Sequence, residues 1–138
     1  NCGRYGCLET YASATGIVYT AKELLERDNK PSVLREMEIT AKAVFDAAEE
    51  NDETALEAVG IFGKYLGRAL ANIAVTVDPE VIVLAGGVVK GGEKVRKPVE
   101  KYYRESAFKT VRDTDIVLAK LENDAGMYGA AKEAFKIV

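Results

Sequence analysis

Apolar residues recur at intervals of three and four along the first half of the chain, a spacing typical of amphipathic helices. The pattern predicts a first helix over residues 8–27 and a second, shorter helix over residues 39–51, with Thr40 as its N-cap. A third helix is predicted with Asp52 as its N-cap, and its apolar positions continue without a break to Val77. At 1.5 Å per residue this third helix would be about 38 Å long, so we expect it to form the spine of the core.

Three glycines, Gly60, Gly63 and Gly67, lie inside the third predicted helix. Each costs about 1 kcal/mol of helix propensity relative to alanine. The cost is understandable where another backbone approaches closely, either from the same chain or from a second subunit. We expect packing within the chain, and a subunit seam is the alternative.

The second half of the chain alternates strands with helices. Pro79 ends the long helix, because the residue before a proline disfavours helical backbone, and the β-branched run at residues 81–85 predicts a buried strand. A second apolar strand is predicted over residues 115–121, and the Asn123-Asp124 pair is predicted to cap a final helix. Residues 79–138 therefore predict a βαβα unit with parallel strands and a right-handed crossover.

The helix between the two strands contains a proline. It follows Gly91 and Gly92 and runs through Tyr102 and Tyr103, and Pro98 predicts that it is broken or begins at that residue. We expect one ring of the tyrosine pair in the core and one on the surface. Taken together, the predicted elements indicate an α/β fold with an unusually high helix content.

Length and composition favour one domain. The 138 residues fit the usual range of roughly 100–200 residues per domain, and 48% hydrophobic residues can supply a core. With 19 basic and 22 acidic residues the net charge is -3, which argues against nucleic acid or an anionic membrane surface as the main partner. No apolar run approaches the roughly 18 residues of a membrane span, and the first residues lack a signal-peptide pattern, so we expect a cytoplasmic protein.

The chain contains no histidine and two cysteines. Without a histidine it cannot form a Ser-His-Asp or Cys-His catalytic centre by itself. Cys2 and Cys7 flank Gly3 and Gly6, so both thiols could turn back onto one metal ion. Zinc takes four ligands, so a closed site needs two more, and the alternative is a pair of unlinked cysteines. Because Asn1 is not an initiator methionine, we expect the chain to be the C-terminal portion of a longer protein.

Two further features are candidates for ligand binding. The carboxylate of Glu9 could clamp adjacent sugar hydroxyls, or it could only stabilise the start of a helix through the macrodipole. Gly86 and Gly87 follow a predicted strand at its carboxyl end, where ligands bind in open α/β sheets. This glycine pair lacks the spacing of a P-loop or a dinucleotide fingerprint, so an ordinary strand-to-helix turn is the alternative.

The stretch Cys2-Gly3-Arg4-Tyr5-Gly6-Cys7-Leu8-Glu9 resembles the cysteine signature of the ROK family of sugar kinases and repressors. In that family the signature reads Cys-x-Cys-Gly-x-x-Gly-Cys-x-Glu, and Asn1 corresponds to the residue between its first two cysteines. The run at residues 12–18 is most similar to the bacterial glucokinases of the family. The resemblance covers essentially the whole chain and continues through residues 45–48, 70–72, 78–80, 82–88 and 123–126.

This resemblance implies the C-terminal lobe of an actin-like, ribonuclease-H-like sugar kinase that lacks its first strands. It implies that Cys2 and Cys7 are two of four zinc ligands, the others being a histidine and a cysteine upstream of this chain. It implies that Glu9 hydrogen-bonds sugar hydroxyls. It also implies that the turn at Gly86 and Gly87 lies against the adenosine of a nucleotide.

In the whole kinase the implied reaction is phosphate transfer from ATP to the 6-hydroxyl of glucose, with Mg²⁺ bridging the phosphates. The family's catalytic aspartate lies upstream, so we expect no catalytic residue in this chain and no activity from it alone. Glucose or a related hexose and ATP are the implied partners. We also expect a homodimer, because the sheet formed by residues 81–85 and 116–119 would be covered incompletely. One alternative is the effector-binding lobe of a sugar-responsive repressor of the same family, and another is a self-standing α/β interaction module.

Overall fold

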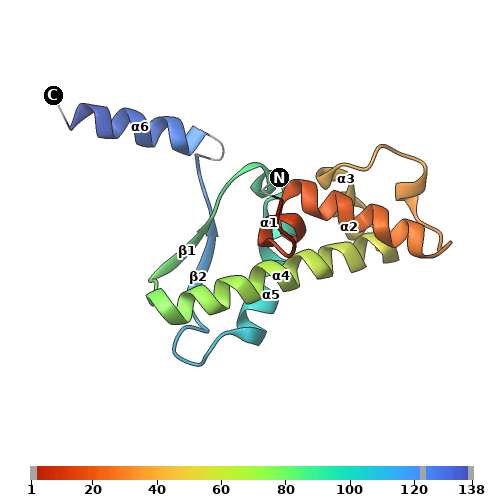
Figure 1. The fold of residues 1–138 in the computed structure, drawn as a ribbon, viewed down its shortest axis with the longest axis horizontal. Helices are drawn as coiled ribbons and strands as arrows, with labels where there is room; N and C mark the ends of the chain where they lie inside the picture. Colours follow the sequence, from red (N-terminus) through yellow and green to blue (C-terminus); the bar gives the residue numbers. More distant parts are fainter. Residues whose placement is uncertain (1–2, 122–123, 137–138) are drawn as a thin grey trace.

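The computed structural model describes residues 3–121 and 124–136. Helix α4 runs through the middle of the molecule and contacts α1, α2, α3 and α5, while a two-stranded sheet lies near its C-terminal end (Figure 1). The helices and strands are, in chain order, α1 (Leu8–Tyr11), α2 (Ala14–Arg27), η1 (Val33–Arg35), α3 (Ala41–Glu49), α4 (Glu53–Val77), β1 (Val81–Leu84), η2 (Gly87–Gly91), α5 (Glu93–Ser106), β2 (Asp115–Leu118) and α6 (Ala125–Phe135). Within the described residues, no helix is both long enough and apolar enough to cross a membrane.

The start of α4 is fixed by Asp52, which confirms its prediction as an N-cap. Its carboxylate accepts hydrogen bonds from the Ala55 amide at 2.9 Å, the Val33 amide at 2.9 Å and the Ser32 hydroxyl at 3.1 Å. Burial raises the pKa of Asp52, but these hydrogen bonds together outweigh burial and hold the pKa below its ordinary value of 3.8. The helix ends at Asp78, whose left-handed backbone with φ of 45° turns the chain toward β1.

Two of the three glycines of α4 mark its close approach to α5. A Cβ atom on Gly63 would lie 2.8 Å from the backbone oxygen of Pro98, and one on Gly67 would lie 2.7 Å from the backbone oxygen of Val99. No side chain fits at such distances, so the two backbones are in direct contact. The expectation that these glycines serve packing within the chain is confirmed for Gly63 and Gly67, while Gly60 makes only an ordinary contact with the Tyr102 hydroxyl.

Helix α5 runs unbroken with Pro98 inside it, so the predicted break or later start at the proline is wrong. Val95, Val99 and Tyr103, on both sides of the proline, are each 0% exposed. Burying these side chains contributes about 1.5–3 kcal/mol each, which outweighs the roughly 3 kcal/mol cost of a proline in a helix interior. Tyr103 is the core member of the tyrosine pair, and Tyr102 is half-buried.

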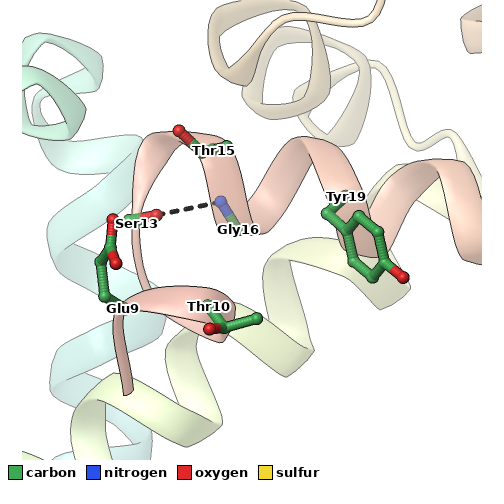
Figure 2. Close-up of a pocket in the computed structure, with 6 residues that line it drawn as sticks. All are labelled: Glu9, Thr10, Ser13, Thr15, Gly16 and Tyr19. Atoms are coloured by element: carbon green, nitrogen blue, oxygen red, sulfur yellow. Dashed lines mark hydrogen bonds between the residues drawn. The ribbon is translucent and has the colours of Figure 1, made fainter. Parts of the chain in front are cut away.

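The single helix predicted over residues 8–27 is in fact two helices, α1 and α2. Ser13 breaks the pattern because it takes an extended conformation and its hydroxyl accepts a hydrogen bond from the Gly16 amide at 3.0 Å. Gly16 packs so closely on α1 that a Cβ atom there would lie 2.6 Å from the Thr10 backbone oxygen. The break therefore folds α1 back against the beginning of α2 and brings Glu9 to the start of that helix (Figure 2).

The two strands pair in parallel, as predicted, with Val81 opposite Asp115 at the start of the register. Leu84 and Ile116 lie on the buried face of the sheet. The prediction of a buried strand at residues 81–85 holds for one face of β1 only. No layer of the described chain covers the other face, in line with the expectation that the sheet would be covered incompletely. That face exposes Val81, Val83 and Val117, at 45%, 55% and 40%.

Helix α6 lies beyond the sheet, away from the helical body (Figure 1). Its apolar residues Met127, Tyr128 and Phe135 are exposed by 66%, 57% and 81%. Asp124 precedes the helix but its side chain makes no capping hydrogen bond, so that half of the predicted Asn123-Asp124 cap is wrong. Asp124 has helical backbone, whereas a capping residue typically has extended backbone. Asn123 lies outside the described residues.

Candidate functional site

A small hollow of about 180 Å³ lies where α1 meets α2. Figure 2 shows the Glu9 carboxylate on the same side of this junction as the Ser13 hydroxyl. The structure thus places Glu9, a candidate sugar-binding residue in the sequence, in the wall of a hollow. The hollow is lined by Glu9, Thr10, Ser13, Thr15, Gly16 and Tyr19.

The chemistry of this hollow suits a ligand with several hydroxyl groups. A carboxylate offers two acceptor oxygens, whereas serine and threonine hydroxyls both donate and accept. Glu9 supplies the carboxylate, and Ser13 and Thr15 supply hydroxyls from the next helix. Gly16 keeps α1 in contact with α2, because any side chain there would push Thr10, and with it Glu9, away.

A larger hollow of about 430 Å³ lies between α3, η2 and the start of α5. Gly87, a candidate nucleotide-binding residue, lines it, and no atom lies within 4 Å of the position its Cβ would take. Gly86 is outside the lining, and its φ of 95° turns the chain from β1 into η2. The hollow is lined by Ala41, Lys42, Phe45, Asp46, Gly87, Val88, Lys90, Gly91 and Lys94.

Charged groups of this larger hollow form a bridge between two helices. The Lys94 amine on α5 lies 2.7 Å from an Asp46 oxygen and 2.8 Å from a Glu49 oxygen, both on α3. Lys42 pairs with the other Asp46 oxygen. The hydrogen bond to Asp46, followed by that to Glu49, raises the pKa of Lys94 to about 12. Hydrogen bonds from Lys42 and then Lys94 lower the pKa of Asp46, so both groups are charged at neutral pH.

Sequence reasoning missed this bridge. Lys94 and Asp46 are 48 residues apart. Asp46 lies in a stretch that resembles the family, at residues 45–48, but that resemblance gave it no partner. Among the residues of this hollow, the sequence pointed only to Gly87, because it follows the end of a strand. The sequence does not indicate which helix faces that glycine.

Of the two candidate zinc ligands, only Cys7 lies within the described residues. Cys2 lies outside the described residues, and Cys7 is half-buried at the N-cap of α1. Residues 3–121 and 124–136 contain no group of three or more cysteine, histidine, aspartate or glutamate side chains that could hold a metal ion. Since structural zinc takes four ligands, the described donors are too few for it.

Comparison with known proteins identifies the family. Residues 1–136 match the model of the ROK family. The chain is 41% identical over 134 residues to a glucokinase from Halalkalibacterium halodurans, a match that covers 94% of this chain and 41% of that protein. These matches establish that the chain belongs to the ROK family.

Solved structures of both kinases and regulators share the fold. A ROK family glucokinase from Streptomyces griseus, solved in complex with glucose and AMPPNP, matches with a TM-score of 0.82 at 29% identity, over 95% of this chain and 45% of that one. A ROK family transcriptional regulator, a homologue of the Escherichia coli MLC protein, matches with a TM-score of 0.77 at 31% identity, over 95% of this chain and 33% of that one. The chain therefore carries part of the helix-rich α/β fold of ROK sugar kinases and regulators.

The chain spans about two fifths of the length of the curated glucokinase relatives it matches.

Proposed function

We propose that the chain provides one wall of the sugar site and one wall of the nucleotide site of a glucokinase, which transfers a phosphate from ATP to the 6-hydroxyl of glucose. The observation that carries this proposal is the presence of two separate hollows with different chemistry. One has a carboxylate and hydroxyls around Glu9, and the other has an apolar part and a charged part beside Gly87. The identity of 41% to a glucokinase supports the same assignment.

In the sugar site, Glu9 would accept hydrogen bonds from two neighbouring hydroxyls of glucose. A carboxylate suits a pair of adjacent hydroxyls because each of its oxygens accepts one of them. Ser13 lines the same hollow and would add a hydroxyl group to this site (Figure 2). A charged acceptor forms a stronger hydrogen bond than a neutral one, so Glu9 carries most of the affinity in this wall.

In the nucleotide site, the open face of Gly87 would receive the flat base. A side chain at this position would fill the space that the glycine leaves clear. Val88 and Phe45 add apolar surface to the same hollow. Small-molecule sites commonly combine such apolar surface with a few placed polar groups.

Magnesium and zinc belong to the proposal for the whole enzyme. Mg²⁺ would accompany ATP and neutralise charge on its phosphates during transfer. Cys2 and Cys7 would each give one thiolate to a structural zinc ion, and two further ligands would come from another polypeptide segment. The family resemblance assigns the catalytic aspartate to a segment outside these 138 residues, so we expect this chain to bind ligands without turnover.

Calorimetric titration with glucose and with ATP tests the proposal. We expect the variant Glu9→Gln to lose at least about tenfold in glucose affinity, because a hydrogen bond to a charged group contributes about 1.5–3 kcal/mol. ATP affinity should not change. Glu26→Gln is the matched control, since Glu26 is an exposed acid on α2 outside the hollow. Unchanged glucose binding by Glu9→Gln, or glucose phosphorylation by the 138-residue chain in a coupled assay, would contradict the proposal.

The effector-binding lobe of a repressor is the second candidate, favoured by the structural match to a ROK family transcriptional regulator. A repressor lobe would bind a sugar but no ATP. The coding sequence upstream of Asn1 separates the two candidates directly. An Asp-x-Gly-Gly-Thr phosphate loop there supports the kinase, and a helix-turn-helix segment without that loop supports the repressor.

We further propose that the protein is a homodimer. The open sheet face around Val83 and the apolar residues of α6, such as Phe135, expose surface that a second chain could cover. Light scattering should give a mass of two chains. A monodisperse monomer would contradict this proposal.

A further inference from the structure

The larger hollow combines apolar surface with more basic than acidic side chains. Among the residues that line it, Lys42, Lys90 and Lys94 are basic, and Asp46 is the only acid. A base resting on Gly87 leaves the attached ribose to meet the charged part of the lining. Ribose hydroxyls are donors that need a fixed acceptor, and Asp46 is the one anionic acceptor that the lining offers.

Asp46 is held rigidly enough to serve as such an acceptor. One of its carboxylate oxygens receives Lys94 at 2.7 Å, and the other receives Lys42. Each carboxylate oxygen has two lone pairs, so each keeps one for a ligand hydroxyl. The side chain is 38% exposed, which leaves it accessible from the hollow.

Lys94 contributes more to this arrangement than Lys42. Lys42 is on the same helix as Asp46 and is 86% exposed, so it restrains neither helix against another. Lys94 is 32% exposed and reaches from the first turn of α5 to both Asp46 and Glu49 on α3. The bridge from Lys94 therefore fixes the orientation of Asp46 and the separation of two walls of the hollow.

We propose that Asp46 accepts hydrogen bonds from the ribose hydroxyls of the nucleotide, and that Lys94 is the positioning residue that holds Asp46 in place. This inference rests on the proposed nucleotide site and adds to it the group that selects a ribonucleotide.

The test compares the binding of ATP and of 2′,3′-dideoxy-ATP to the chain by calorimetry. The wild-type chain should bind ATP at least about tenfold more tightly than the dideoxy analogue, because the analogue lacks both hydroxyl donors. Asp46→Asn should bring the two affinities to within about twofold of each other. An Asp46→Asn variant that keeps the wild-type ratio would overturn the role of Asp46.

Variants of Lys94 test positioning separately from folding. Lys94→Met should reduce the ATP to dideoxy-ATP ratio, and Lys94→Arg should restore it, because arginine can also bridge Asp46 and Glu49. Lys97→Met is the matched control, since Lys97 is an exposed lysine of the same helix outside the hollow. A purely structural role would lower the melting temperature of Lys94→Met without changing the ratio, and this result would overturn the role of Lys94. These variants also decide the question if Asp46→Asn does not fold.

The outcomes for the wild-type chain separate this inference from the proposed function. Equal affinity for ATP and dideoxy-ATP overturns the inference alone and leaves the nucleotide site in place. Absence of binding to either nucleotide overturns the proposed nucleotide site and the inference together.

Discussion

The contact between α4 and α5 makes a sharp prediction about three glycines of one helix. Alanine at Gly63 or Gly67 would place its Cβ 2.8 or 2.7 Å from backbone oxygens of α5, closer than real Cβ atoms approach other atoms. Backbone atoms cannot rotate away as a flexible side chain can, so the two helices must separate. At Gly60, on the same helix, the new Cβ would lie 3.6 Å from the Tyr102 hydroxyl, which is an ordinary contact.

The magnitude follows from two opposing effects. Alanine gains about 1 kcal/mol of helix propensity over glycine at each of the three positions. Overpacking at Gly63 and Gly67 costs about 1–3 kcal/mol. We therefore expect these two variants to lose up to about 2 kcal/mol of unfolding free energy, which lowers the melting temperature by as much as about 8 °C for a chain of this size. Gly60→Ala should instead gain up to about 1 kcal/mol.

Urea unfolding followed by far-ultraviolet circular dichroism measures all three variants in one series. The wild-type chain and Gly60→Ala serve as the references, since Gly60→Ala makes the same chemical change without the clash. If Gly63→Ala and Gly67→Ala are stabilised as much as Gly60→Ala, the direct backbone contact between α4 and α5 is refuted.

Two further predictions concern stability. The pKa of Asp52 is lowered in the folded chain, so its contribution to the unfolding free energy is present above its unfolded pKa and is lost as the pH falls through the folded value. Asp52→Ala should lower the unfolding free energy by about 1 kcal/mol near pH 7 and flatten its dependence on acid pH, as measured by urea unfolding. Asp113→Ala is the control, because Asp113 is exposed. The Tyr103 hydroxyl donates a buried hydrogen bond to the backbone oxygen of Val111. Tyr103→Phe should therefore lower the unfolding free energy by about 1–3 kcal/mol in the same assay. A loss no larger than that of Tyr102→Phe would contradict this prediction.

Local interactions made much of the fold predictable. Thr40 and Asp52 each cap a helix by accepting a hydrogen bond from an amide three residues later, so sequence spacing alone indicates both caps. The two parallel strands follow from their β-branched runs and the helix between them. Ser13 also caps a helix through the amide three residues later. The apolar spacing continues across Ser13, however, and therefore predicted one helix where the structure has two.

Features that depend on distant contacts were not predictable. Pro98 stays inside a helix because neighbouring side chains are buried against α4, which the local pattern does not reveal. Glu9 was found because it lies in a family motif, and Gly87 was found because it follows the end of a predicted strand. The pair of Asp46 and Lys94 was missed because the fold, and no sequence motif, brings α3 to the start of α5.

We propose that the chain carries two separate ligand sites, one for a sugar and one for a nucleotide. Amide NMR spectra recorded during separate titrations with glucose and ATP test this claim most directly. Glucose should shift the amide signals of Glu9 and Gly16, and ATP should shift those of Gly87 and Gly91. Absence of shifts at Gly87 with ATP, or shifts of the same residues by both ligands, would contradict the account.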